Sequence, residues 1–263
     1  MRFKRSLLDK IKAVLDELGE DEAEPARVYH EFSKLDGVWV PVPSGRFPGL
    51  VKKMEGIKEV KLPSGKELAG LLEEKLWKVL VTRRSRRDYE PGGIRLDELA
   101  ALLHFSVGIW GSKYGYPLRP YPSAGALQPV EVYSIVGEVE GLEPGIYHYD
   151  PSIPSLKLIR EGDLRGELMS IALGQGHVGE APLSLVLTVV YARTRWKYGA
   201  RAYRYVHLDA GFAAQNIYLI AEALGLGTCA VGAFSDDGLS RLLGIDGWSE
   251  FPMLIMPIGR RRR

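Results

Sequence analysis

The order of apolar and polar residues divides the chain into an N-terminal extension and a main domain. Apolar residues recur at helical spacing within residues 7–18 and predict a first helix. Residues 36–65 are rich in Pro and Gly, which predicts an extended arm lying on another surface. A further helix is predicted from residue 64 or 66 to residue 80. We therefore expect an N-terminal helical extension and arm over residues 1–78 and one main domain over residues 79–263.

The main domain mixes helical and strand patterns. Residues 207–224 are apolar almost all round, and the Ala and Gly residues among them let another backbone approach closely, so this helix must be covered on every side. Residues 183–191 form a nearly continuous apolar run, as expected of a strand buried on both faces. Shorter helices are predicted at residues 96–105 and 164–173, and further strands at residues 130–136, 145–149, 156–159 and 253–258.

Composition narrows the class of protein. The 263 residues are 46% hydrophobic, which is enough for a large core, and the net charge of +2 is too small to imply nucleic acid binding by itself. The single cysteine, Cys229, excludes an internal disulfide and a Cys-rich metal site, and we interpret it as a buried small residue. The five histidines lack metal-binding spacing, so no metal site is predicted. Because no apolar run reaches about 20 residues, we expect a cytoplasmic protein without a membrane span.

The segment Arg83-Arg84-Ser85-Arg86-Arg87 is the strongest chemical signal in the chain. Guanidinium groups and a hydroxyl so close together suit a bound phosphate, because an Arg presents a planar fork of donors. A solvated basic turn or a nucleic-acid patch fits this segment equally well. Two other segments have the composition of a functional site rather than of a structural scaffold. They are residues 119–129, which lead into a strand, and residues 225–234, which follow the long helix. Gly225 closes that helix, which argues against a dinucleotide-binding fingerprint.

Taken together, these three segments resemble the FMN-dependent nitroreductase superfamily. Trp196-Lys197-Tyr198-Gly199, with residues 203–205 and 145–150, resembles its SagB-type branch, the azoline dehydrogenases that aromatise thiazoline or oxazoline rings in peptides. The match runs nearly continuously over residues 79–263. The resemblance implies an α+β fold, a mostly antiparallel sheet flanked by helices. It also implies an obligate homodimer with residues 207–224 at its interface and two flavin sites between the subunits.

The resemblance also implies roles for individual residues toward FMN. Ala126 stands where many relatives have Asn, which puts one polar contact to the flavin ring in doubt. The basic tail offers Arg260 as a further phosphate ligand or is simply solvated. The implied FMN contacts are Arg83, Ser85 and Arg87 on the phosphate and ribityl chain, Arg84 near the ring through its backbone, Val231, Gly232 and Ala233 beside the ring, and Pro122, Ser123, Gly125 and Gln128, which the partner subunit would contribute.

In the SagB-type branch a Lys-Tyr pair acts as the base, and here the pair would be Lys197 and Tyr198. The proposal is physically reasonable because a neighbouring ammonium stabilises a phenolate. A plain alternative is an aromatic-anchored loop with a solvated Lys. The function implied is oxidation of azoline-like rings, with a possible cyclodehydratase partner. An NAD(P)H-dependent nitro or quinone reductase and a non-catalytic flavin-binding or basic binding protein remain open.

Overall fold

The computed structural model describes residues 47–262, so the helix predicted at residues 7–18 lies outside the described residues. Within residues 47–262, eight strands form one sheet in the order β1-β7-β6-β5-β8-β10-β2, with β9 also pairing with β10. All these strand pairs are antiparallel. The strands are β1 (Lys58–Lys61), β2 (Tyr89–Glu90), β5 (Val130–Val136), β6 (Gly145–Asp150), β7 (Ser155–Glu161), β8 (Leu183–Val190), β9 (Leu226–Thr228) and β10 (Glu250–Arg261).

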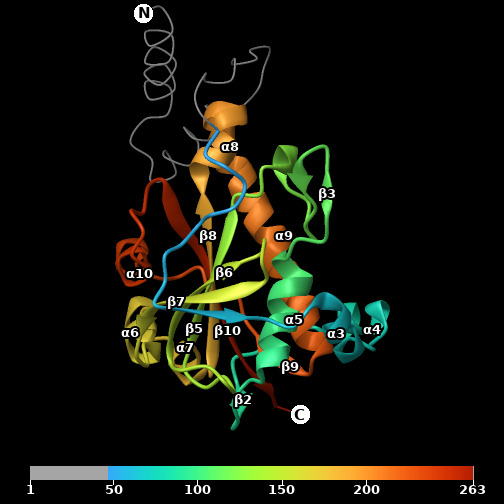
Figure 1. Cartoon of the computed structure of the whole chain (residues 1–263). Helices are drawn as coiled ribbons and strands as arrows, with labels where there is room; N and C mark the ends of the chain where they lie inside the picture. Colours follow the sequence, from blue (N-terminus) through green and yellow to red (C-terminus); the bar gives the residue numbers. More distant parts are fainter. Residues whose placement is uncertain (1–46, 263) are drawn as a thin grey trace, which may run out of the picture.

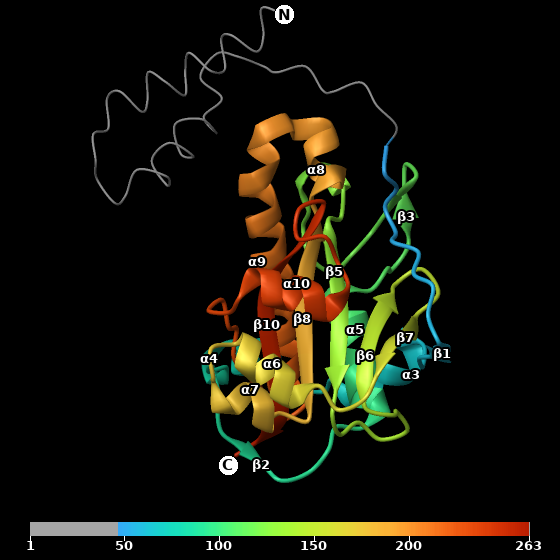
Figure 2. The ribbon, with the colours of Figure 1, turned by 90° about the vertical axis from the view of Figure 1, so that its left-hand side faces the viewer.

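Helices cover both faces of this sheet (Figures 1 and 2). Helices α5 (Leu96–Val107) and α9 (Ala202–Ala223) pack on one face, and their side chains form the larger core with those of β5, β8 and β10. Helices α6 (Arg165–Ile171), α7 (Gly176–Glu180) and α10 (Asp236–Leu243) pack on the other face and enclose a second core. The predicted α+β fold with a mostly antiparallel sheet is therefore confirmed.

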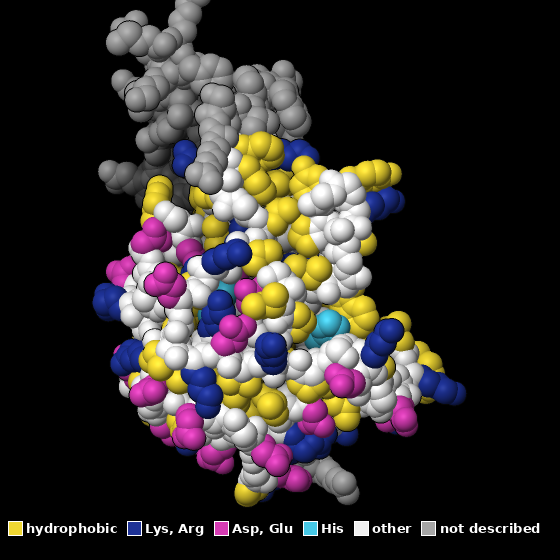
Figure 3. Space-filling model, viewed as in Figure 1, with side chains coloured by type: hydrophobic (Ala, Val, Ile, Leu, Met, Phe, Trp, Pro, Cys, Tyr) yellow, Lys and Arg dark blue, Asp and Glu magenta, His cyan; other side chains and the backbone are white. Residues whose placement is uncertain are grey.

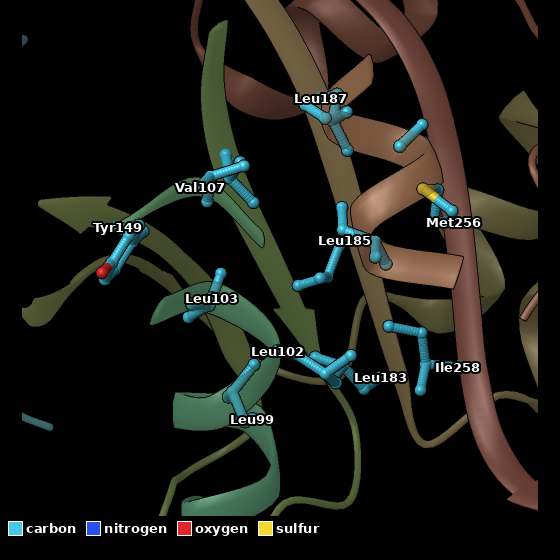
Figure 4. Close-up of a cluster of buried hydrophobic side chains, with 14 of the residues drawn as sticks. Leu99, Leu102, Leu103, Val107, Tyr149, Leu183, Leu185, Leu187, Met256 and Ile258 are labelled. Atoms are coloured by element: carbon cyan, nitrogen blue, oxygen red, sulfur yellow. The ribbon is translucent and has the colours of Figure 1, made fainter. Parts of the chain in front are cut away.

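The apolar runs became strands because their side chains are buried on both faces. Every residue of β5 is buried, and in β8 only Val190 is partly exposed. Figure 4 shows Leu183, Leu185 and Leu187 of β8 in the same cluster of buried side chains as Leu99, Leu102 and Leu103 of α5. Each fully buried Leu contributes about 1.5–3 kcal/mol relative to an exposed one, so burial of these strands stabilises the domain.

Several predicted elements have different bounds in the structure. The helix predicted from residue 64 or 66 to residue 80 is broken into α3 (Gly65–Leu68), the short 3-10 helix Ala69–Leu71 and α4 (Leu76–Thr82). Gly70 lowers helix propensity at this break. The strand predicted to end at residue 191 ends at Val190, because Tyr191 begins helix α8 (Tyr191–Tyr198). The helix predicted from residue 207 begins five residues earlier, at Ala202.

Helix α9 buries one face and exposes apolar residues on another. Ala213 and Ile217 are fully buried against the sheet, whereas Leu208 is 51% exposed and Phe212 is 44% exposed. The expectation that this helix is covered on every side is not met within one chain. The uncovered apolar face is what a second copy would cover in the expected homodimer.

The described part of the arm runs along the main domain from the region of α8 to β1 (Figure 1). The ring of Phe47 packs edge-on against Trp196 of α8, with ring centroids 5.0 Å apart. Lys52 forms an ion pair with Glu250, whose other oxygen accepts a hydrogen bond from Tyr133 at 2.9 Å. The arm therefore lies directly beside the helix that carries Lys197 and Tyr198. The domain boundary at residue 78 stays a prediction.

Candidate functional site

The predicted phosphate-binding residues follow α4 and lie against β9. Ser85 forms a β-bridge with Thr228, and the Arg86 backbone N–H donates to the Thr228 carbonyl at 2.9 Å. Arg86 itself points toward the buried Glu222, with its Nε 3.7 Å from the carboxylate. Successive side chains in this extended segment point to opposite sides, so Ser85 is exposed where Arg86 points inward. We call Arg83, Arg84, Ser85 and Arg87 the arginine cluster.

Tyr218 of α9 joins the arginine cluster to the segment predicted to lie beside the flavin ring. Its hydroxyl lies 3.0 Å from Ser85 Oγ and accepts a hydrogen bond from the Ala230 N–H at 2.7 Å. The Arg83 guanidinium carbon lies 5.1 Å from the centre of the Tyr218 ring, within the range of a cation–π interaction. The Tyr218 side chain therefore contacts three residues of the candidate site, Arg83, Ser85 and Ala230. Sequence reasoning missed Tyr218, because nothing local marks it.

The residues predicted to lie beside the ring follow Ala230. Val231 is buried, and it exchanges two backbone hydrogen bonds with Ile255 of β10, at 2.8 and 3.0 Å. Gly232 and Ala233 are exposed. Among the described residues, no neighbouring atom lies within 4 Å of the position that a Cβ atom on Gly232 would take. A segment that is hydrogen-bonded to β10 at Val231 and to Tyr218 at Ala230 therefore borders open space at Gly232.

A second group of predicted residues meets where α8 touches the loop at residues 122–128. A Cβ atom added to Gly125 would lie 2.8 Å from Tyr198 Oη and 3.1 Å from Lys197 Nζ, so both side-chain ends reach the loop backbone. The Gly125 φ of 62° favours glycine. The Tyr198 ring packs edge-on against Tyr205, with centroids 4.9 Å apart. We call Ser123, Gly125, Gln128, Lys197 and Tyr198 the lysine–tyrosine cluster.

Asp209 of α9 is a site residue that sequence reasoning missed. Its carboxylate accepts hydrogen bonds from Ser123 Oγ at 2.7 Å and from the Ala124 N–H at 3.2 Å, and Ser123 Oγ in turn accepts from the Gln128 N–H at 2.9 Å. Burial raises the pKa of Asp209, and the bonds from Ser123 and Ala124 oppose that rise. The sequence did offer one sign of its role, since Asp209 is a carboxylate within the apolar run at residues 207–224. Asp209 holds one end of the loop on α9.

Gln128 and Pro122 lie at opposite ends of the same loop and differ in exposure. Pro122 is exposed, whereas Gln128 is buried and its Nε2 donates to the Pro117 carbonyl at 3.5 Å. Gln128 Oε1 is buried and has no hydrogen-bond partner among the described residues. A buried acceptor without a donor costs free energy, so this oxygen suits a donor from a ligand or a second subunit.

The two clusters lie on different faces of α9. Asp209, which holds Ser123, and Tyr218, which holds Ser85, are nine positions apart on this helix. At 100° per residue, nine positions correspond to a half-turn offset and about 14 Å along the axis. Within a single chain, the arginine cluster and the lysine–tyrosine cluster are therefore two separate groups of residues.

The Arg260 side chain is already paired within the described residues. Its guanidinium donates to the Glu98 carboxylate through two nitrogens, at 2.6 and 2.7 Å, and to the Gly93 carbonyl at 3.2 Å. This paired geometry ties the end of β10 to the first turn of α5. Because the Glu98 carboxylate already pairs with this guanidinium, Arg260 is less available for the phosphate-binding role predicted from the sequence.

Other features lie outside the two clusters. Two surface hollows, of about 390 and 260 Å³, are lined by residues of neither cluster. In residues 47–262, no group of three or more His, Cys, Asp or Glu side chains could hold a metal ion. No helix in this part of the chain is long and apolar enough to cross a membrane. Figure 3 shows apolar side chains exposed on the upper part of one face, around the hairpin of β3 (Ser112–Lys113) and β4 (Tyr116–Pro117).

Comparisons with known proteins agree with this geometry. The model of the nitroreductase family matches residues 80–260. A protein of Methanocaldococcus jannaschii, assigned by name to the nitroreductases, is 40% identical over 203 residues, which are 77% of this chain and 96% of that protein. The microcin B17-processing protein McbC of Escherichia coli is 27% identical over 146 residues, and the matched region spans about half of each chain, 54% in both cases.

A solved structure shows the same fold. The crystal structure of a nitroreductase-like protein from Anabaena variabilis superposes with a TM-score of 0.72 at 30% identity, and it covers 92% of this chain and 48% of that one. The relation to McbC supports the SagB-type branch within the family. The chain belongs to the nitroreductase family of oxidoreductases.

Proposed function

We propose that this protein is an FMN-dependent dehydrogenase of the SagB type that oxidises azoline-like rings. The observation that carries the proposal is the contact of Lys197 and Tyr198 with the loop at Gly125. A proton-transferring pair is useful only if it is held at the cofactor-binding surface, and this loop is the one the family resemblance assigns to the flavin. The likeness to McbC, named as a processing protein for microcin B17, supports the same substrate class.

The residues present fit FMN. The arginine cluster offers guanidinium and hydroxyl donors at an exposed surface, and a cluster ending in Arg suits a monophosphate. The space beside Gly232 leaves room for a flat ring against backbone, and the unpartnered Gln128 Oε1 can accept a hydrogen bond from a ring N–H. In this proposal Arg83, Ser85 and Arg87 hold the phosphate, with Arg84, Val231, Gly232 and Ala233 near the ring.

The chain's own residues supply positioning and proton transfer. Aromatising an azoline removes one proton and one hydride from adjacent carbons, and bound FMN supplies the hydride acceptor. Tyr198, as phenolate, takes the proton, and the ammonium of Lys197 stabilises the phenolate charge. The edge-on packing of Tyr198 against Tyr205 limits its rotation. A cyclodehydratase is the class of enzyme that would form the ring beforehand, and it is the partner we propose.

We further propose that the working form is a homodimer in which each flavin site combines one arginine cluster with the other subunit's lysine–tyrosine cluster. The half-turn offset of the two clusters on α9 supports this arrangement. The exposed Leu208 and Phe212 on α9 support it too, since a second copy would bury them. Pro122, Ser123, Gly125 and Gln128 would then act across the interface.

A second candidate function is NAD(P)H-dependent reduction of nitro compounds or quinones. The relative of M. jannaschii, which the chain covers almost fully, favours it by name. Such a reductase needs open space over the ring but no base, so Lys197 and Tyr198 would have no task in it.

Anaerobic reduction assays on the purified protein, after its bound flavin has been identified by mass, separate the two candidates. We expect FMN to copurify and a thiazoline-containing peptide to bleach it anaerobically. Bleaching by NADH or NADPH, together with inertness toward thiazoline and oxazoline peptides, would favour the reductase instead. A protein that neither contains nor binds a flavin would refute both.

A further inference from the structure

Arg193 is a fully buried arginine that the proposed chemistry does not use. It lies on α8 and is only 2% exposed. A buried charge is costly unless it is paired and hydrogen-bonded, so its retention in the core calls for a specific task. It precedes Lys197 by four residues, which places both on the same side of α8.

The Arg193 guanidinium holds two parts of the chain with one nitrogen. Its Nη1 lies 2.6 Å from Glu131 Oε1 and donates to the Gln128 carbonyl at 2.8 Å. Glu131, which is also buried, lies 2.8 Å from the ring Nε2 of His148. Arg193 thus binds both the start of β5 and the last residue of the loop that carries Gly125.

This network is strongly ionic. Burial alone would raise the pKa of the Glu131 carboxyl, but the hydrogen bond with His148 and the charges of Arg193, His148 and Arg119 outweigh it and lower the pKa to about 2. Arg119 also donates to the Val130 carbonyl at 3.2 Å. Arg193 and Arg119 therefore both hold carbonyl groups at the C-terminal end of the loop, those of Gln128 and Val130.

The loop needs such fastening because its backbone is strained. Gly125, Ala126 and Gln128 have φ values of 62°, 57° and 50°. Residues other than glycine hold a left-handed conformation only where the surroundings over-determine it. Asp209 fixes the loop at Ser123 and Ala124, and Arg193 fixes it at Gln128.

We propose that Arg193 is a positioning residue that sets the loop at residues 122–128 in register with α8, so that Lys197 and Tyr198 face Gly125. The inference rests on the proposed function for its catalytic consequence, but its structural part stands independently. Arg193 does not touch the reacting atoms. It acts through the Gln128 carbonyl and through the first turn of its own helix.

The substitution Arg193→Lys tests this role without removing the charge. A Lys side chain is one bond shorter, about 1.3 Å, so its ammonium cannot keep both contacts unless the loop or the helix moves. Thr188→Val is a matched control, because Thr188 is fully buried, pairs with Glu131 across β5 and β8, and donates to Glu250 instead. If Arg193→Lys does not fold, the double variant Glu131→Leu/Arg193→Met removes both charges together.

The readout is fluorine NMR of the full-length protein with 3-fluorotyrosine at its 13 tyrosines. The Tyr198 resonance is assigned by its loss in Tyr198→Phe. We expect it to shift or broaden in Arg193→Lys, to stay in place in Thr188→Val, and azoline turnover to fall about 100-fold at unchanged flavin content.

The outcomes separate this inference from the proposed function. An unmoved Tyr198 resonance in Arg193→Lys, and in the double variant if that is used, would overturn the positioning role whatever the turnover. A moved resonance in a protein whose parent does not oxidise azolines would uphold the positioning of Tyr198 and refute the proposed function alone. A shift of equal size in Thr188→Val would show that any buried change moves Tyr198 and would also overturn the role.

Discussion

Removing one hydroxyl, in Tyr218→Phe, tests whether Tyr218 is the link between the arginine cluster and the ring-binding segment. The Phe ring retains the cation–π contact with Arg83 but cannot accept the Ala230 N–H or pair with Ser85. An unpartnered donor costs about 1–3 kcal/mol. Because Tyr218 is only partly buried, and water can reach the freed groups, we expect about 1–2 kcal/mol of lost stability.

Urea unfolding of the flavin-free protein measures this loss, and FMN titration measures its effect on the site. Tyr114→Phe is the matched control, since Tyr114 is 88% exposed in the β3–β4 hairpin. We expect the control to change the free energy of unfolding by less than about 0.5 kcal/mol. We also expect Tyr218→Phe to weaken FMN binding several-fold through displacement of Ser85 and Ala230. Equal unfolding free energies in the two variants would refute the bridging role.

Two further predictions concern the loop and the buried carboxylate. Gly125→Ala combines a left-handed φ with a Cβ close to Tyr198 Oη and Lys197 Nζ, so it should lower azoline turnover at least tenfold. Gly141→Ala is the control, because its φ is 78° and no described residue beyond its chain neighbours lies within 4 Å of the added Cβ, so it should cost only the backbone strain of about 1–2 kcal/mol. Equal losses of turnover in the two variants would contradict this prediction. The folded pKa of Glu131, about 2, lies below its ordinary value of 4.5, so its stabilisation of about 3 kcal/mol is complete above pH 4.5 and lost as the pH falls toward 2. Acid unfolding followed by circular dichroism should therefore be less steep over this range in Glu131→Gln, and an unchanged profile would be evidence against the ionic network.

The sequence predicted the parts of the fold that depend on local pattern. Strand β8 was predictable because it is a nearly continuous apolar run, and the long helix because it is a long stretch that is apolar almost all round. Helix α8 was not predicted, since its residues are largely polar and its anchor is Arg193, whose partner Glu131 lies on another strand. The break between α3 and α4 was missed because Gly70 is the only local sign of it.

The candidate site was predictable only where its residues form short motifs. The arginine cluster stands out in the sequence because its four residues fall within the five adjacent polar residues 83–87. Tyr218 and Asp209 do not, because their partners Ser85 and Ser123 are 133 and 86 positions away along the chain. Arg260 was predicted to be a phosphate ligand because it lies in a basic tail. Its pairing with Glu98 was not predicted, because the two residues are 162 positions apart along the chain. Long-range pairing of this kind has no local signature.

The most direct test of the central claim, that Lys197 and Tyr198 serve proton transfer at a flavin, is Tyr198→Phe in the FMN-loaded protein. The substitution removes only the ionisable hydroxyl. We predict unchanged FMN content and subunit association, a fall of 10²–10⁴ in the turnover of a thiazoline peptide, and little change in flavin reduction by NAD(P)H where that occurs. Retained thiazoline turnover in Tyr198→Phe, at full FMN content, would contradict the account and leave the reductase as the better assignment.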